Sequence, residues 1–262
     1  MRTTSVTIAV LAASLPGLIS CSKKDDPAQL APSASSLASS QASPAAMAWH
    51  YAIDPKSTTH VDMPGLKEHI KGDTTAAKGT LDVVGTDLAQ SRGTIMIDLA
   101  TFATNTFGND DDATQTKHAR TWLEVVVDGQ THDDMRWATL AIRAIDGLSA
   151  FDLSKVAPSK DGNDDVRSVD MVVHGDVLVH GHKLQKDVPV TVAFRYPSGA
   201  APTSEPTRVD IQSKAPMRVV LKEVDVQPRD TVGTLTAWTT SLVSKVAEYA
   251  DVTVKLGATP AQ

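Results

Sequence analysis

Val-His-Gly-His-Lys-Leu-Gln-Lys-Asp-Val-Pro-Val, residues 179–190, lies at the centre of the stretch from Ser168 to Phe194 that decides the fold. This stretch predicts two β-strands, over 169–179 and 187–194, joined by a polar connection over 180–186. In the second strand, Val188, Val190 and Val192 alternate with other residue types, a period of two that is typical of a strand with one buried face. The first strand is more evenly apolar, which is consistent with burial of both faces.

Residues Met1 to Cys21 predict an export signal, a lipoprotein signal peptide that ends at a Cys. Arg2 supplies a positive charge, and the apolar run from Val6 to Leu15 is shorter than the roughly 20 residues that span a bilayer. Leu18-Ile19-Ser20-Cys21 then matches a bacterial lipobox, in which the Cys is lipidated and becomes the mature N-terminus. The alternative is an ordinary secretory peptide cut elsewhere. The lipobox is favoured because Cys21 is the only Cys in the chain.

Lipidation of Cys21 predicts a stable membrane anchor, since each buried methylene contributes about 0.8 kcal/mol. Ser22 after the Cys resembles lipoproteins sorted to the outer membrane of Gram-negative bacteria, on its periplasmic or surface face. Residues 22–48 are rich in Ser, Ala, Pro and Gln, which predicts a disordered tether. With Cys21 acylated no thiol remains for a disulfide, so the exported domain must depend on its core.

The folded domain is expected over 49–257, followed by a short tail over 258–262. Strand signals outnumber helix signals there, and no internal repeat or second linker divides it. Besides the hairpin, strands are predicted over 49–53, 79–84, 94–99, 137–145, 208–212, 217–226 and 252–256. A short helical turn is predicted over 116–125, an amphipathic helix over 235–248 and a loop over 157–165. These patterns predict an all-β domain with little helix.

The order of these motifs resembles the YceI-like family. Residues 179–190 are similar to its signature hairpin, Ile53 to Ser57 to its opening segment, and 252–256 to its closing strand. Thr104 follows the paired strands as in the family, and Trp122 with Leu123 stands where large apolar residues normally plug the barrel. The chain departs from the family over 222–233, which lacks an aromatic residue, and over 130–165, which is longer.

The resemblance implies a single antiparallel eight-stranded lipocalin-like barrel with one or two short helices. It also implies non-catalytic binding of a polyisoprenoid or similar lipid. A barrel of this size is just wide enough to be filled by side chains or to hold one slender ligand. Because only 4% of the residues are aromatic, a hollow interior would suit an alkyl or isoprenoid chain better than a flat ring.

The expected lipid-binding residues are inward-facing and mostly aliphatic, with His118 and Arg120 at a polar mouth. They are Ile95, Ile97, His118, Arg120, Trp122, Leu140, Ile142, Val173, Val177, Val190 and Val192. No cofactor is expected beyond a bound isoprenoid or fatty-acid-like lipid. The expected partners are this lipid and the membrane, and a homodimer stays open.

Three histidines of the hairpin raise the question of a metal site. His174, His180 and His182 share strand parity, and two histidines at i and i+2 can form a metal pair. However, a loop beginning at Gly181 would break the strand before His182, and the sequence identifies no further ligand. The acidic stretches 110–112 and 161–165 lack the ligand pattern of an EF-hand. The sequence therefore predicts no metal site.

The remaining function classes find little support. A net charge of −6 argues against nucleic acid as a partner and against electrostatic docking on anionic lipid. The sequence has no G-x-S-x-G elbow, H-E-x-x-H motif, P-loop or dinucleotide fingerprint. Non-catalytic lipid binding is therefore the leading hypothesis. Its rivals are a surface or structural interaction lipoprotein with a side-chain-filled barrel and, less favoured, a metal-dependent periplasmic enzyme.

Overall fold

The structure is a computed structural model that describes residues 47–64, 69–108, 110–127, 129–227 and 247–262. Cys21, most of the expected tether and most of the expected helix over 235–248 lie outside these ranges. Within them the chain is mainly antiparallel sheet with one α-helix. No helix in the described ranges is long and apolar enough to cross a membrane.

The described strands are β1 (Trp49–Ile53), β2 (Thr58–Pro64), β3 (His69–Thr74), β4 (Ala77–Val83), β5 (Arg92–Asp98), β6 (Ala103–Thr104), β7 (Val126–Val127), β8 (Gln130–Thr131), β9 (Trp137–Asp146), β10 (Ser159–Asp161), β11 (Asp164–Val179), β12 (His182–Pro197), β13 (Arg208–Ser213), β14 (Met217–Val220) and β15 (Tyr249–Pro260). The helix is α1 (Asp111–Trp122), and the short 3₁₀ helices are η1 (Leu88–Gln90), η2 (Leu99–Thr101), η3 (Leu153–Lys155) and η4 (Leu221–Val224).

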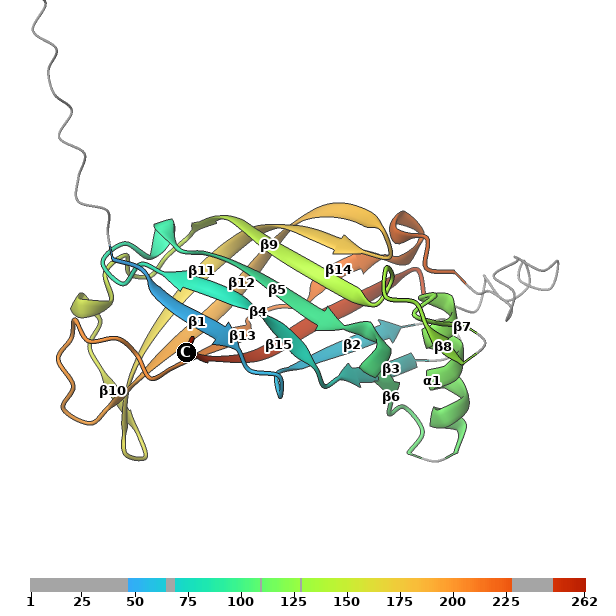
Figure 1. The fold of residues 1–262 in the computed structure, drawn as a ribbon, viewed down its shortest axis with the longest axis horizontal. Coiled ribbons are helices and arrows are strands. Elements are labelled where there is room, and N and C mark those ends of the chain that lie inside the picture. The colour runs from blue at the N-terminus through green and yellow to red at the C-terminus, as the bar shows by residue number, and fades with distance from the viewer. Residues whose placement is uncertain (1–46, 65–68, 109, 128, 228–246) are drawn as a thin grey trace, which may run out of the picture. The chain divides into compact units, whose positions relative to one another are not determined.

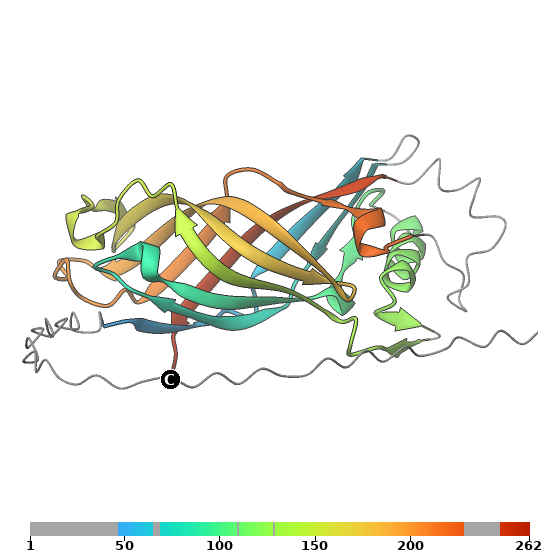
Figure 2. The same cartoon turned by 90° about the horizontal axis from the view of Figure 1, so that it is seen from above.

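Eight of these strands close into a barrel (Figures 1 and 2). They follow one another in the order β1-β4-β5-β9-β11-β12-β13-β15, and β15 pairs back onto β1. Along its other half β15 pairs with β2, so that β2, β3 and β6 extend the sheet. Every pairing in the ring is antiparallel. The predicted eight-stranded antiparallel barrel is confirmed.

The hairpin that decides the fold is longer and tighter than predicted. β11 and β12 pair continuously from Asp164 opposite Pro197 to Val179 opposite His182. The turn is therefore His180-Gly181, with φ angles of 48° and 74°, the positive values that a type I′ turn requires. The predicted polar connection over 180–186 is wrong, because residues 182–186 belong to β12 and pair with β11. Backbone groups alone form the hydrogen bonds of a β-ladder, so polar side chains do not prevent pairing, and here they are exposed or half-buried.

Side chains of the hairpin alternate between the core and the outer face. Val173 and Val177 of β11 are buried, as are Val188, Val190 and Val192 of β12. Burying each such side chain contributes roughly 1.5–3 kcal/mol. The outer face of β11 is not covered, since Leu178 is 44% exposed. The apolar character of this strand therefore does not reflect burial of both faces.

Gly175 marks an irregularity where β11 crosses β9. The register between these strands shifts at His174–Gly175, as at a β-bulge. A Cβ atom at position 175 would lie only 2.2 Å from Cδ1 of Leu140. The glycine thus leaves room for Leu140, one of the residues expected to face inward.

The helix α1 lies at one end of the barrel, and β10 lies at the other (Figure 1). Thr104 ties α1 to β6, because its backbone N–H donates to Thr116 Oγ1 at 2.9 Å and its hydroxyl donates to the Asp112 carbonyl at 2.8 Å. The helical turn expected over 116–125 is thus a longer helix that begins at Asp111.

The other predicted strands and the predicted loop are confirmed in part. The strands expected over 49–53, 79–84, 94–99, 137–145, 208–212 and 252–256 are present, with shifted ends. β15 runs on to Pro260, beyond the expected domain end at 257. The strand expected over 217–226 ends at Val220, where η4 begins. The loop expected over 157–165 contains β10, which pairs with β11, and the polar strands β2 and β3 were not predicted.

Candidate functional site

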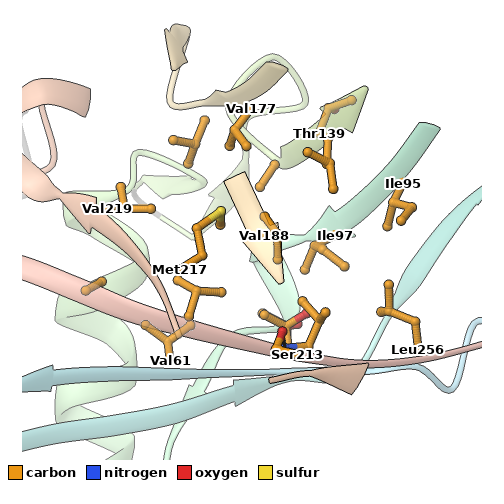
Figure 3. A pocket seen from close by; sticks show the side chains of 18 of the residues that line it. Val61, Ile95, Ile97, Thr139, Val177, Val188, Ser213, Met217, Val219 and Leu256 are labelled. Atoms are coloured by element: carbon orange, nitrogen blue, oxygen red, sulfur yellow. Dashed lines mark hydrogen bonds between the residues drawn. The ribbon is translucent and has the colours of Figure 1, made fainter. Parts of the chain in front are cut away.

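The barrel encloses a cavity of about 310 Å³. Side chains from seven of the eight ring strands (β4, β5, β9, β11, β12, β13 and β15), together with α1, line it. Ile95, Val188 and Met217 are seen there in Figure 3. Pockets that bind small molecules have volumes of roughly 300–1,000 Å³. The interior is therefore large enough for a ligand, although each strand also contributes to the core.

Ten of the eleven residues expected from the sequence lie on the wall of this cavity. They are Ile95, Ile97, His118, Trp122, Leu140, Ile142, Val173, Val177, Val190 and Val192. The eight aliphatic ones come from β5, β9, β11 and β12, where every second side chain faces inward. His118 and Trp122 come from α1, and their rings stack with centroids 6.4 Å apart. The structure thus brings the expected set together in one place.

Arg120 is the exception, because it does not line the cavity. Its Nε donates a hydrogen bond to the Phe102 carbonyl oxygen at 2.8 Å. The structure does not bring Arg120 to the cavity wall beside His118, for a geometric reason. On an α-helix, residues i and i+2 point to different faces, whereas i and i+4 lie on the same face, so His118 shares its face with Trp122 instead.

Two threonines that the sequence analysis missed add polar atoms to the lining. Thr59 and Thr74 lie opposite each other across β2 and β3, and they are 4% and 1% exposed. Among the described residues, neither hydroxyl has a hydrogen-bond partner. A buried hydroxyl without a partner is unfavourable, so both are suited to bond a polar group of a ligand. Nothing in the sequence distinguishes them from ordinary strand threonines.

Charged groups are almost excluded from this wall. Among the described residues that line it, none is Asp, Glu, Lys or Cys. Arg92 lies at its edge, where Nη1 donates to the carbonyl oxygens of Ala89 at 2.9 Å and Ser91 at 2.6 Å. General acid–base chemistry needs positioned titratable groups, and His118 is the one described histidine on the wall. The arrangement suits retention of an apolar molecule better than its chemical conversion.

The end of the barrel near β10 is packed instead of hollow. Tyr51 is fully buried there, and its hydroxyl donates to the Pro206 carbonyl oxygen at 2.9 Å. The buried Arg167 donates from Nη1 to the carbonyl oxygens of Val156 and Leu153. Burial raises the pKa of Tyr196 to about 12. None of these side chains belongs to the cavity wall, so the interior is closed at this end.

Among known proteins, similarity to this chain is found in solved structures. No family model and no curated protein matches the chain. Among solved structures, a polyisoprenoid binding domain from Saccharophagus degradans, implicated in plant cell wall breakdown, is similar at 16% identity and a TM-score of 0.46, over 80% of this chain and 98% of that chain. Burkholderia cenocepacia BcnA is similar at 16% identity and a TM-score of 0.49, over 79% and 99%. The chemistry of the site rests on its own residues.

Proposed function

We propose that this protein binds an amphiphilic or isoprenoid lipid inside its barrel and does not catalyse a reaction. The observation that carries the proposal is the cavity of about 310 Å³ with its aliphatic wall. Each methylene moved from water into such surroundings contributes about 0.8 kcal/mol. A chain of about ten methylenes therefore contributes roughly 8 kcal/mol before the entropic costs of binding, which suffices for measurable retention.

The chemistry of the wall narrows the class of lipid. Val, Ile and Leu side chains adapt to a slender, flexible chain, whereas a flat ring system would need aromatic stacking platforms. Besides the ring of His118, the aromatic side chains among the described residues of the wall are Phe102, Trp122 and Phe194, a small minority of the lining. The hydroxyls of Thr59 and Thr74 and the ring of His118 offer hydrogen bonds to a polar end group. A long alkyl or isoprenoid chain with a neutral polar end fits these features.

Cys21 supports the further proposal that the barrel is tethered to a membrane. The lipobox at Leu18–Cys21 and the Ser-rich stretch over 22–48 favour an exported bacterial lipoprotein, anchored at the outer membrane on its periplasmic or surface face. The partners of the protein would then be the bound lipid and the membrane. In this arrangement the tether keeps the barrel close to a source of ligand.

The rival functions fit the molecule less well. A purely structural lipoprotein would have a barrel filled by side chains, and the cavity volume argues against that. A metal-dependent enzyme would need titratable groups at a substrate pocket, and the described wall offers few.

A binding titration tests the proposal. Residues 43–262 form one compact unit with the whole described core, so this unit can be titrated with a fluorescent long-chain fatty acid, with a polyisoprenol as competitor. We expect saturation at one ligand per chain. Val177→Phe, which fills the cavity, should weaken binding at least tenfold. Its matched control, Leu178→Phe on the exposed outer face, should not change binding. Equal binding by both variants would refute the proposal.

A further inference from the structure

His180 lies where three segments of the chain meet: the β11–β12 turn and the segments that end α1 and η4. Its Nδ1 lies 2.9 Å from the carbonyl oxygen of Val224, the last residue of η4. Its Nε2 lies 3.0 Å from Oε2 of Glu124, which follows α1. The residue is only 5% exposed. One imidazole in the β11–β12 turn therefore contacts the segments that end α1 and η4.

Asp225 supplies the ligand that the sequence analysis did not find for the hairpin histidines. One ligand atom each of His180, His182 and Asp225 lie within 4.8 Å of one another. Zn²⁺ bound tetrahedrally, with bonds of about 2.0–2.2 Å, holds its ligand atoms roughly 3.3 Å apart. The ring of His182 is exposed, so its rotation can close the remaining gap. His174, in contrast, lies farther along β11 and takes no part.

The hydrogen bond to Val224 prepares His180 for a cation. A backbone carbonyl can only accept, so Nδ1 of His180 carries the proton that faces it. Nε2 makes a hydrogen bond with Oε2 of Glu124, and metal-bound histidines usually donate their other N–H in the way that Nδ1 does here. A zinc ion would replace the proton between Nε2 and Oε2 of Glu124, and both atoms would then donate electron pairs to the ion.

Turns of the backbone bring three of these residues together. Glu124, His180 and Asp225 have φ angles of 53°, 48° and 52°, and they are the non-glycine residues with positive φ in the described ranges. Glycine adopts this conformation with the least strain. The chain instead has two carboxylates and an imidazole at these positions, and all three lie together. His180 adopts this conformation in the type I′ turn and Asp225 in the left-handed cap of η4.

We propose that His180, His182 and Asp225, with Glu124 as a fourth donor, bind one zinc ion. Two imidazoles with carboxylates are a donor set that Zn²⁺ prefers. The ion would fasten the turn of the central hairpin to the segments that follow α1 and η4. Val224 and Val226, on either side of Asp225, line the cavity, but none of the four donors does. The site therefore does not depend on lipid binding.

Zinc content and thermal stability test the site. The full chain, purified in mild detergent without a polyhistidine tag, is stripped with chelator and then given Zn²⁺ alone. We expect one zinc per chain after removal of the excess. At a zinc concentration about a hundred times the dissociation constant, the melting temperature should rise by roughly 5–10 °C.

Two variants separate this site from unrelated zinc binding. His182→Ala removes an exposed ligand, so its melting temperature in chelator should equal that of the unchanged chain. Its affinity for zinc should fall more than about a hundredfold. His174→Ala is the matched control, because His174 contacts Asp187 and Asp146 through opposite ring nitrogens and cannot converge them on one ion. Zinc retained by His182→Ala, lost by His174→Ala, or absent from the unchanged chain would overturn the proposal.

Discussion

The end of the barrel near β10 is packed with side chains, whereas the interior toward α1 is hollow, although the same strands build both. β12 shows the change along a single element. Its inward residues Val188, Val190 and Val192 line the cavity, while Tyr196, farther along the same face, fills the packed end. The backbone ladder of β12 is continuous through both regions. The size of the side chains, and not the path of the chain, decides which part of the barrel is hollow.

Both regions contain buried polar atoms with and without hydrogen-bond partners. Near β10, the hydroxyl of Tyr51 and the guanidinium of Arg167 donate to backbone carbonyls, whereas the hydroxyl of Tyr196 has no partner among the described residues. In the hollow region, the hydroxyls of Thr59 and Thr74 have no partner among the described residues. Satisfied polar groups stabilise a core, whereas unsatisfied ones reduce stability and leave bonds available. From the position of the cavity, which Tyr51, Arg167 and Tyr196 do not line, we infer that the packed end maintains the fold and that the hollow end holds the ligand.

The largest expected effect comes from making the same substitution in both regions. Leu153→Ala, in the packed end, should lower the free energy of unfolding by about 2–5 kcal/mol, because it creates a new cavity. Leu140→Ala should cost less than about 2 kcal/mol, because that side chain already borders empty space. Urea unfolding of the two variants measures both values. Equal losses would mean that the two regions are packed alike.

Removing a hydroxyl from each region should have opposite consequences for stability. Tyr51→Phe leaves the Pro206 carbonyl oxygen without its donor and should cost about 1 kcal/mol. Thr59→Val removes a hydroxyl without a partner and should be neutral or stabilising by up to about 1 kcal/mol. Thermal unfolding of both variants provides the measurement. A clear loss of stability in Thr59→Val would show that this hydroxyl has a structural role.

The smallest expected effect concerns the outer surface, which belongs to neither region. Asp187 and then Asp146 accept hydrogen bonds from His174 and raise its pKa above 6.5. Because the folded state binds this proton more tightly, the stabilisation is fully present below pH 6.5 and is lost as the pH rises through the folded-state pKa. His174→Gln should therefore lower the melting temperature at pH 5.5 and match the unchanged chain at high pH. A difference that is independent of pH would contradict this assignment.

The sequence predicted the aliphatic residues of the cavity wall better than the polar residues around the cavity. Alternating aliphatic residues place eight cavity-lining side chains correctly, because a strand has a fixed period of two. Arg120 was misplaced because the facing of a helical residue depends on where the helix begins, which the sequence left uncertain. Thr59, Thr74 and Asp225 could not be identified from the sequence. Their neighbours are set by the pairing of β2 with β3 and by the contact of the segment after η4 with the hairpin turn.

Native mass spectrometry of residues 43–262 tests the central claim most directly. The unit would be expressed in a bacterium, purified without detergent, and then extracted with organic solvent to identify any lipid. We predict a co-purifying lipid in near one-to-one amount, or its uptake when the bare unit is mixed with a long-chain fatty acid or an isoprenoid. A bare mass that persists after both challenges would contradict the account, and the hollow region would then have no lipid ligand.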